Sequence, residues 1–195
     1  MTRRCITLLL SWLILMGACG VRVVVKPPPE PLRTEQTEAW HKEVLGLAKT
    51  GDWLILRGYH DTDNMVAAYT NHPLSHAVII DMDKQEVIEA VGKGVGLMPL
   101  RQRVHESHRI LLVRPKWWSP ERGKRALAMA RQKVGSSYDY LGTVGADDPK
   151  RFYCTELVTR VYADHFGPNE HFPTVIEPGH MYLYGKLLYD SGSRD

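Results

Sequence analysis

The chain of 195 residues is 44% hydrophobic and 24% charged, which is typical of one globular domain with a proper hydrophobic core. Its formal net charge of +3 falls to +1 when Arg3 and Arg4 leave with the N-terminal segment discussed next, so the charge argues against a nucleic-acid partner. The sequence has no internal repeat and no low-complexity block, and nothing in it marks a second folded domain.

The N-terminus is typical of a secretion signal. Arg3 and Arg4 precede an apolar run over 6–16, and "MGAC" then ends at Cys19. The pattern resembles the bacterial lipoprotein signal, in which the peptide is cut before the cysteine and the cysteine carries the lipid. We therefore expect 1–18 to be removed as a signal peptide and Cys19 to be acylated. The alternatives are an ordinary signal peptide or an uncut anchor, although the run is shorter than the roughly 20 residues of a spanning helix.

A short tether follows the expected lipid site. The proline run over 27–31 favours an extended polyproline II spacer, so we assign 19–33 to a lipidated tether and 34–195 to the folded domain. Gly20 after the cysteine gives no reason for retention at the inner membrane. The expected location is the bacterial cell envelope, with the chain anchored through Cys19 at the outer membrane and facing the periplasm.

The domain is predicted to mix helices and strands. Apolar positions at helical spacing predict helices, and short apolar runs between turn residues predict strands. Two of the strands, separated by "MDKQ", are expected to form a β-hairpin, and the order of elements predicts an α+β fold. The expected elements in chain order are a helix over 34–49, a strand over 52–58, a loop or short helix over 59–71, the hairpin strands 75–81 and 86–91, a stretch broken by glycines over 92–96, a strand over 108–115, a helix over 119–135, a helix that begins near Cys154, and an irregular segment over 172–189.

Cys154 is the one cysteine expected to remain a free thiol in the mature chain, since Cys5 lies in the signal peptide and Cys19 carries the lipid. Apolar residues spaced as on one helix face follow it, which places it in the first turn of a helix. A thiolate there faces the positive end of the helix dipole and is the reactive form of the side chain. The alternative is a small buried residue that only fills space. The apolar positions are Leu157, Val158, Val161, Tyr162 and Phe166.

The hairpin carries a candidate base and a candidate acid for a thiol mechanism. His76 begins its first strand and Glu89 lies on its second. In an antiparallel pair, an even-numbered loop puts His76 and Glu89 on one face, diagonal or directly opposite, and puts Glu86 on the other face. A carboxylate beside an imidazole fixes its tautomer and stabilises the imidazolium. Taken singly, each residue has a plainer explanation. His76 would be a structural histidine, and Glu89 would be a solvated strand residue.

Five stretches of the chain carry a family resemblance: "GDWLILRG", "SHAVIID", "VIEAVGKGVGLMPL", "YDYLG" and "FYCTELV". Over about Gly51 to Phe166 the chain resembles the permuted papain-like enzymes of the NlpC/P60 superfamily, in particular the YiiX/YaeF group of amidases. The histidine precedes the cysteine here, whereas in ordinary enzymes of this superfamily the cysteine comes first, and this order is the mark of the permutation. The resemblance implies a small antiparallel sheet packed against the helix that carries the cysteine.

By this resemblance Cys154 is the nucleophile, His76 the general base and Glu89 the orienting acid, with no cofactor and no metal. It implies a papain-like cysteine hydrolase, an amidase or peptidase, or else an acyltransferase, that acts on an amide or ester. Tyr153, beside the cysteine, is a candidate to line the substrate site. A tethered envelope enzyme has peptidoglycan stem peptides close by, and lipid amides or esters are also admitted because relatives in the superfamily act on lipids.

Two other classes of function remain open. A zinc hydrolase would use His72, His76 and Cys154, yet Pro73 interrupts the helical spacing that a zincin pair needs, and no fourth ligand suggests itself. The other is a catalytically inactive lipoprotein that keeps the fold and only binds cell-wall or lipid ligands, because fold does not settle activity.

Overall fold

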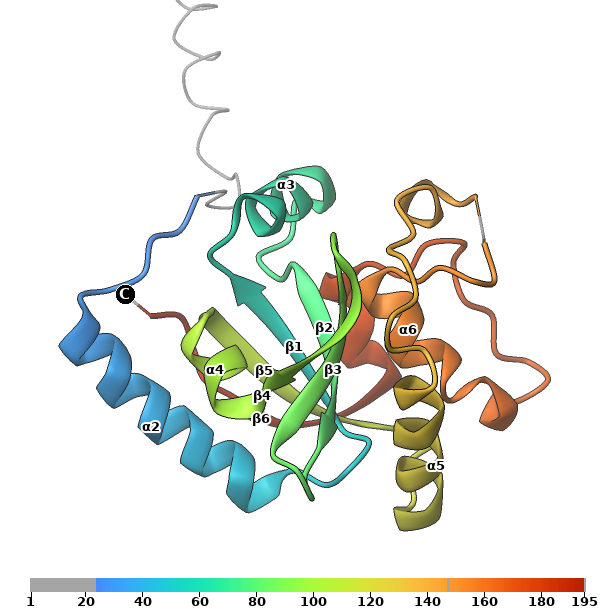
Figure 1. Cartoon of the computed structure of the whole chain (residues 1–195), viewed down its shortest axis with the longest axis horizontal. Helices are drawn as coiled ribbons and strands as arrows, with labels where there is room; N and C mark the ends of the chain where they lie inside the picture. The colour runs from blue at the N-terminus through green and yellow to red at the C-terminus, as the bar shows by residue number, and fades with distance from the viewer. Residues whose placement is uncertain (1–23, 147, 195) are drawn as a thin grey trace, which may run out of the picture.

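The computed structural model describes residues 24–146 and 148–194. In these residues six antiparallel strands form one sheet, in the order β4-β3-β2-β1-β5-β6 (Figure 1). The strands are β1 (Trp53–Gly58), β2 (His76–Asp81), β3 (Glu86–Val91), β4 (Gly94–Pro99), β5 (Ser107–Pro115) and β6 (Gly185–Asp190). The helices are α2 (Glu30–Leu47), α3 (Asp61–Thr70), α4 (Leu100–His105), α5 (Pro120–Arg131) and α6 (Cys154–Arg160), with 3-10 turns η1 (Gly142–Val144), η2 (Ala163–His165) and η3 (Pro178–Tyr184).

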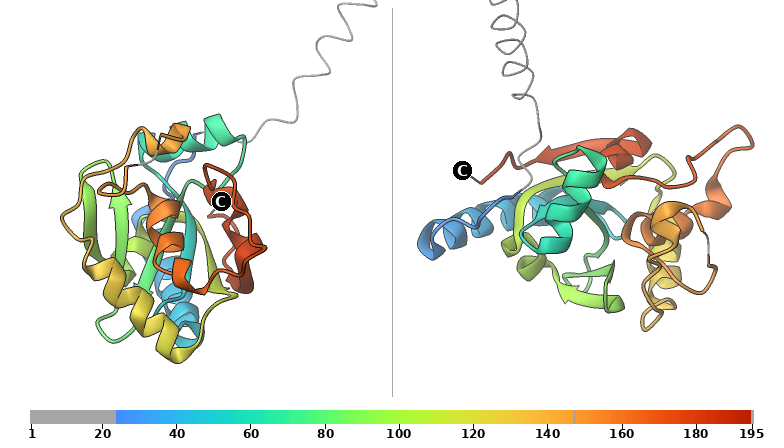
Figure 2. Two further views of the ribbon diagram at one scale, coloured as in Figure 1. Left: turned by 90° about the vertical axis from the view of Figure 1, so that its right-hand side faces the viewer. Right: turned by 90° about the horizontal axis from the view of Figure 1, so that it is seen from above.

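Helices cover both faces of the sheet, which gives the molecule three layers (Figures 1 and 2). On β1, Trp53 and Ile55 join the core shared with α5 and α6, whereas Leu54 and Leu56 join the core shared with α2 and α4. Because successive side chains of a strand point to opposite faces, a strand buried on both sides must be apolar throughout. The α+β prediction is confirmed, and α6 packs against β2 and β3 as a papain-like arrangement requires.

Helix α2 begins earlier than the sequence predicted. It starts at Glu30 instead of Thr34, because Pro31 occupies the first turn, where the missing N–H of proline costs nothing. Residues 30–33, which we assigned to the tether, are therefore helical, and Val25 before them is already buried. The domain thus begins closer to the expected lipid site than the proline run suggested.

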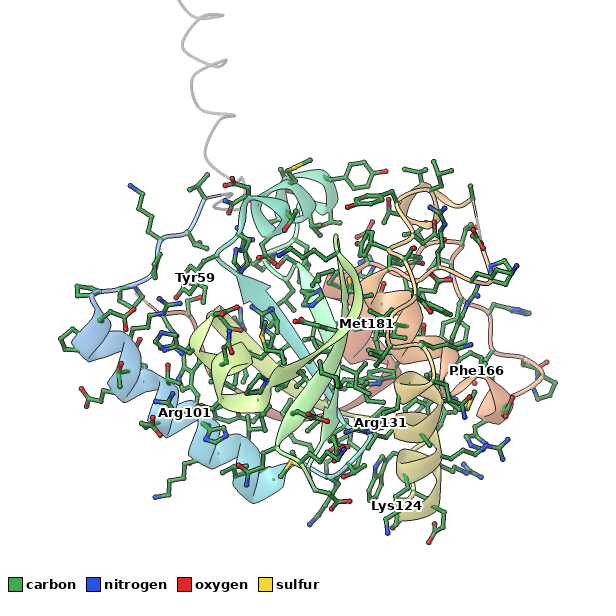
Figure 3. All side chains as sticks on the ribbon, viewed as in Figure 1. Tyr59, Arg101, Lys124, Arg131, Phe166 and Met181 are labelled. Atoms are coloured by element: carbon green, nitrogen blue, oxygen red, sulfur yellow. The ribbon has the colours of Figure 1, made fainter. Side chains whose placement is uncertain are left out.

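The hairpin of β2 and β3 has the predicted parity. Its four-residue loop lies between Asp81 and Glu86, which pair directly. The same register carried along the strands puts Glu89 on the face of His76 and diagonal to it, so the directly opposed arrangement is wrong. Glu86 faces the other side, where Arg131 of α5 contacts the carboxylates of both Asp81 and Glu86. Figure 3 labels Arg131.

Helix α3 lies within 59–71, where a loop or a short helix was predicted, so the helical alternative is confirmed. Local patterns missed the elements whose partners are distant in sequence. The glycine-broken stretch forms β4 because β3 supplies a full ladder of backbone partners. The segment over 172–189, predicted to be irregular, includes β6, which pairs with β5 far earlier in the chain. Helix α4 was not predicted, and it carries a residue of the site described next.

Candidate active site

His76 is the first residue of β2, and the segment before it is fixed by α3. The backbone N–H of Ser75 donates to the carbonyl of Leu56 at 2.9 Å. The hydroxyl of Ser75 donates to Oδ1 of Asp63, on α3, at 2.6 Å, and the backbone N–H of His60 donates to the other oxygen of this carboxylate at 3.1 Å. These bonds hold the start of the strand, so the imidazole of His76, which is 10% exposed, has a defined place.

Glu89 lies beside His76 as the diagonal register requires. Nε2 of His76 and Oε2 of Glu89 are 2.7 Å apart, and both side chains are buried. Because Glu89 engages Nε2, the other ring nitrogen, Nδ1, is left to exchange a proton with a thiol. A carboxylate in this position fixes the tautomer of the imidazole and favours its protonated form.

Arg103 of α4 completes the environment of Glu89 and was not identified from the sequence. Its Nη1 donates to Oε2 of Glu89 at 3.1 Å, and its Nη2 donates to Oε2 of Glu106 at 3.3 Å. The hydroxyl of Ser107 donates to the carbonyl of Arg103 at 2.7 Å, which fixes the end of the helix. Nothing in "LRQRVHESH" separates Arg103 from its polar neighbours, since only the fold turns it inward.

The charges around Glu89 keep it ionised. Burial alone would raise the pKa of Glu89, but the hydrogen bond and the charge of His76, with the guanidinium of Arg103, outweigh burial and lower the pKa to about 2. The carboxylate therefore stays negative throughout the neutral range, as an orienting acid must.

Cys154 is the first residue of α6, as predicted, and it is a buried free cysteine. The carboxylate of Glu156 accepts a hydrogen bond from the backbone N–H of Tyr153 at 3.1 Å, in the manner of a capping box. Leu157 and Val158 anchor the helix in the core on the face of the sheet that it covers. The start of α6 is thus fixed from both sides of the thiol.

The thiol of Cys154 lies within hydrogen-bonding reach of His76 and changes its pKa. Burial alone would lower the pKa of His76, but hydrogen bonds with Cys154 and Glu89, together with the negative charges of the thiolate and the carboxylate, outweigh burial and raise the pKa to about 10. The imidazole therefore keeps its proton at neutral pH. The structure brings the three residues together, and their catalytic roles stay a prediction.

Two tyrosines lie close to the thiol. Tyr153 lines a pocket of about 290 Å³ beside α6, whose other walls include Phe172 and Ile176, but Cys154 does not line it. Burial raises the pKa of Tyr153 to about 12, so its phenol stays protonated. Tyr138, which sequence reasoning missed, lies near enough to Cys154 that the thiolate charge adds to burial in raising its pKa. A substrate-binding role for Tyr153 stays a prediction.

Of the three residues proposed for a zinc site, His76 and Cys154 lie together, but with His72 they form no group arranged to hold a metal ion. His72 packs against Gly179 and lies 6.4 Å from His180 between ring centroids, and its Nδ1 accepts from the backbone N–H of Leu74. Within 24–146 and 148–194, no group of three or more histidines, cysteines and carboxylates is arranged to hold a metal ion. The geometry therefore favours a thiol site over a zinc site.

The predicted signal peptide and the lipidation site at Cys19 lie outside the described residues. Within the part of the chain that the structure describes, no helix combines the length and the apolar character needed to span a membrane.

Comparisons with known proteins point to one family. The model of a family described as "Permuted papain-like amidase enzyme, YaeF/YiiX, C92 family" matches residues 48–181, which include all three candidate catalytic residues. A similar solved structure is described as the metalloprotein yiiX from Escherichia coli O157:H7. It is 25% identical, with a TM-score of 0.52, over 62% of this chain and 67% of that chain. No curated protein matches significantly.

Proposed function

The chain belongs to the C92 family of permuted papain-like amidases of the YaeF/YiiX type, as its motifs predicted, and we propose that it is a cysteine hydrolase of amide or ester bonds. In this proposal Cys154 is the nucleophile, His76 the general base and acid, and Glu89 the orienting acid. The observation that carries the proposal is the buried contact of 2.7 Å between His76 and Glu89, on an imidazole whose protonation Cys154 also favours.

The first half of the reaction forms an acyl-enzyme. His76 takes the thiol proton as the general base, and the thiolate of Cys154 attacks the carbonyl carbon. The imidazolium then gives its proton to the leaving amine or alcohol as the carbon–heteroatom bond breaks. Glu89 offsets the positive charge of the imidazolium and holds the ring in one orientation throughout.

The second half releases the product. Neutral His76 accepts a proton from water, the resulting hydroxide attacks the thioester, and the acid leaves as the thiolate returns. If an alcohol or amine attacks instead of water, the same steps give a transferase. The proposed oxyanion donor is the backbone N–H of Cys154, because the first N–H groups of a helix have no partner within the helix.

We further propose that the enzyme acts in the bacterial cell envelope, held by a lipid on Cys19. The support is the sequence alone: the basic residues, the apolar run and "MGAC". Substrates within reach of such an anchor include peptidoglycan peptides and lipid amides or esters.

The test is a substrate screen of the purified processed chain against peptidoglycan fragments and N-acyl amides, with the Cys154→Ser chain beside it. Turnover that needs the thiol supports a cysteine hydrolase. Substantial turnover by the Cys154→Ser chain contradicts it, because a hydroxyl at that position does not form the ion pair with His76 on which the mechanism depends.

A further inference from the structure

Exposed apolar side chains concentrate on two segments of the molecule. Among the described residues, six large apolar side chains are at least 63% exposed, and only Leu183 among them lies elsewhere. Concentrated exposure of this kind marks an interaction surface, whereas single exposed apolar residues are normal. We name the other five the apolar rim: Met65 (70%) and Tyr69 (79%) on α3, and Tyr140 (63%), Leu141 (67%) and Val144 (69%) around η1.

The first arm of the apolar rim, α3, is attached to the residue before His76. Asp63 and Ala67 point inward and are buried, while Met65 and Tyr69, four residues apart, share the outer face. Asp63 is also the residue that accepts the hydroxyl of Ser75 at 2.6 Å. The exposed face of α3 is therefore held at a fixed place beside the imidazole.

The second arm, 138–146, is attached to the other two members of the site. The phenol of Tyr140 donates to the carbonyl of Gly92 at 3.0 Å, just beyond the end of β3, which carries Glu89. The ring of Tyr140 also lies 4.8 Å from that of Tyr138, the tyrosine that senses the charge of Cys154. Tyr138 and Tyr140 thus connect the surroundings of the thiol with the exposed part of the arm.

The two arms lie at the same end of the molecule. In Figures 1 and 2, α3 and the segment around η1 stand at one height, with the ends of β2 and β3 between them. The described chain also begins at this end, near α3 (Figures 1 and 2), and the burial of Val25 fixes its entry. The catalytic residues, the apolar rim and the chain entry therefore share one end.

The length of the preceding chain limits what can cover this end. Val24 follows Cys19 by five positions, and a fully extended chain gains at most about 3.6 Å per position, so Cys19 lies within about 18 Å of Val24. A lipid on Cys19 would bring a bilayer within that distance of α3. Helix α2, with 18 residues, leads away toward the opposite end.

We propose that the apolar rim lies on the bilayer that holds Cys19, and that the thiol acts on an amide or ester of a membrane lipid presented between the two arms. The inference rests on the lipid anchor and the hydrolase chemistry of the proposed function. The side chains of leucine, valine and methionine transfer favourably from water into the boundary between headgroups and acyl chains. Tyrosine places its ring in the same boundary and keeps its hydroxyl in water. The short tether keeps the rim at the surface.

Tryptophan quenching by brominated lipid tests the docked orientation. The processed full chain is reconstituted in vesicles of phosphatidylethanolamine and phosphatidylglycerol with bromine near the headgroup end of the acyl chains. Tyr69→Trp and Leu141→Trp each add one emitter to the apolar rim, and Leu47→Trp adds one at the C-terminal end of α2, on a side chain 40% exposed. Emission of the unsubstituted chain is subtracted.

We expect the bromine to quench most of the added emission of Tyr69→Trp and Leu141→Trp and little of that of Leu47→Trp. Equal quenching of the three, or none in a chain that floats with the vesicles, overturns the docking and leaves the anchor standing. A chain that does not float overturns both. Adding Cys154→Ser must leave the quenching unchanged, since docking does not need the thiol, so this result is independent of the proposed chemistry.

The substrate class is tested with two fluorogenic amides, one with a palmitoyl and one with a butyryl chain, supplied in the same vesicles. We expect the ratio of palmitoyl to butyryl turnover to fall several-fold in Tyr69→Ser and to stay unchanged in Leu47→Ser. Cleavage of the butyryl amide alone overturns the lipid substrate and leaves the hydrolase standing. Cleavage of neither amide, with peptidoglycan fragments cleaved instead, also overturns it.

Discussion

The hairpin of β2 and β3 carries a charged cluster at each end, and the two clusters differ in burial and in consequence. In the catalytic cluster the carboxylate and the guanidinium are both 5% exposed. In the turn cluster Asp81 is as buried, at 3%, but Glu86 is 21% and Arg131 28% exposed. The guanidinium is therefore fully enclosed at one end and reaches solvent at the other. The catalytic cluster comprises His76, Glu89 and Arg103, and the turn cluster comprises Asp81, Glu86 and Arg131.

We propose that burial and a titratable partner, more than the presence of an ion pair, distinguish the cluster that acts in catalysis. Charges interact more strongly where water is excluded, which moves the pKa of Glu89 to about 2 and that of His76 to about 10. Arg131 instead joins α5 to both strands beside the loop, which is a structural role.

The largest expected effect is on turnover. Cys154→Ser and His76→Ala should each lower kcat by on the order of 10⁴-fold or more, because residues that act as one unit fail together. Cys154→Ser should keep a melting temperature near that of the wild type, whereas His76→Ala should lower it, because it takes a buried partner from Glu89. Steady-state kinetics and thermal melts of the same variants test this. If Cys154→Ser lost stability but kept its turnover, Cys154 would be a residue that only fills the core.

The next largest effect is on stability. Arg103→Gln leaves Glu89 as a buried charge with one fewer partner, and breaking a buried pair costs about 3 to 5 kcal/mol. Arg131→Gln removes a partly exposed guanidinium and should cost about 1 kcal/mol. Denaturant unfolding of the two variants measures the contrast. Equal losses would mean that burial does not distinguish the clusters.

A smaller loss of rate is expected for Glu89→Gln, about 100-fold, at the low end of what general acid–base groups contribute. Without the carboxylate the imidazolium is less favoured, so the pKa of His76 falls and the basic limb of the pH–rate profile moves to lower pH. Glu86→Gln, on the same strand, is the control and should leave the limb in place. If the pH–rate profiles of Glu89→Gln and Glu86→Gln coincide, Glu89 does not stabilise the imidazolium.

The smallest effect is the pH dependence of stability. Because the pKa of His76 is raised from 6.5 to about 10, its contribution is complete below pH 6.5 and is lost as pH rises toward 10. The pKa of Glu89 is lowered from 4.5 to about 2, so its contribution is complete above pH 4.5 and is lost as pH falls toward 2. The stability difference between wild type and Glu89→Gln should therefore be largest between pH 4.5 and 6.5 and narrow on both sides. Melting temperatures of the two chains, measured within this range and on both sides of it, test the prediction.

The sequence predicted the parts of the site that follow from local periodicity. The parity of a strand pair puts His76 and Glu89 on one face whatever the even loop length, and the apolar spacing after Cys154 puts it at the start of a helix. Family motifs then connected the two segments, which no local pattern can do.

The sequence did not predict what depends on distant partners. Arg103 lies in a short helix whose six residues show no clear apolar face, and it turns inward only because β3 packs beside α4. Strand β6 depends on β5 for its hydrogen bonds. The start of α2 was missed because the proline run suggested a spacer, although Pro31 is compatible with a first helical turn.

The most direct test of the central claim, that His76 and Cys154 form a thiolate–imidazolium pair, is alkylation of Cys154 by iodoacetamide across pH, which needs no substrate. We expect labelling of the wild type at neutral pH and slightly below it, and labelling of His76→Ala only at higher pH, because the imidazolium no longer favours the thiolate. Glu86→Gln should behave as the wild type. A wild-type thiol that resists the reagent at neutral pH, or a His76→Ala profile identical to the wild type, would contradict the account.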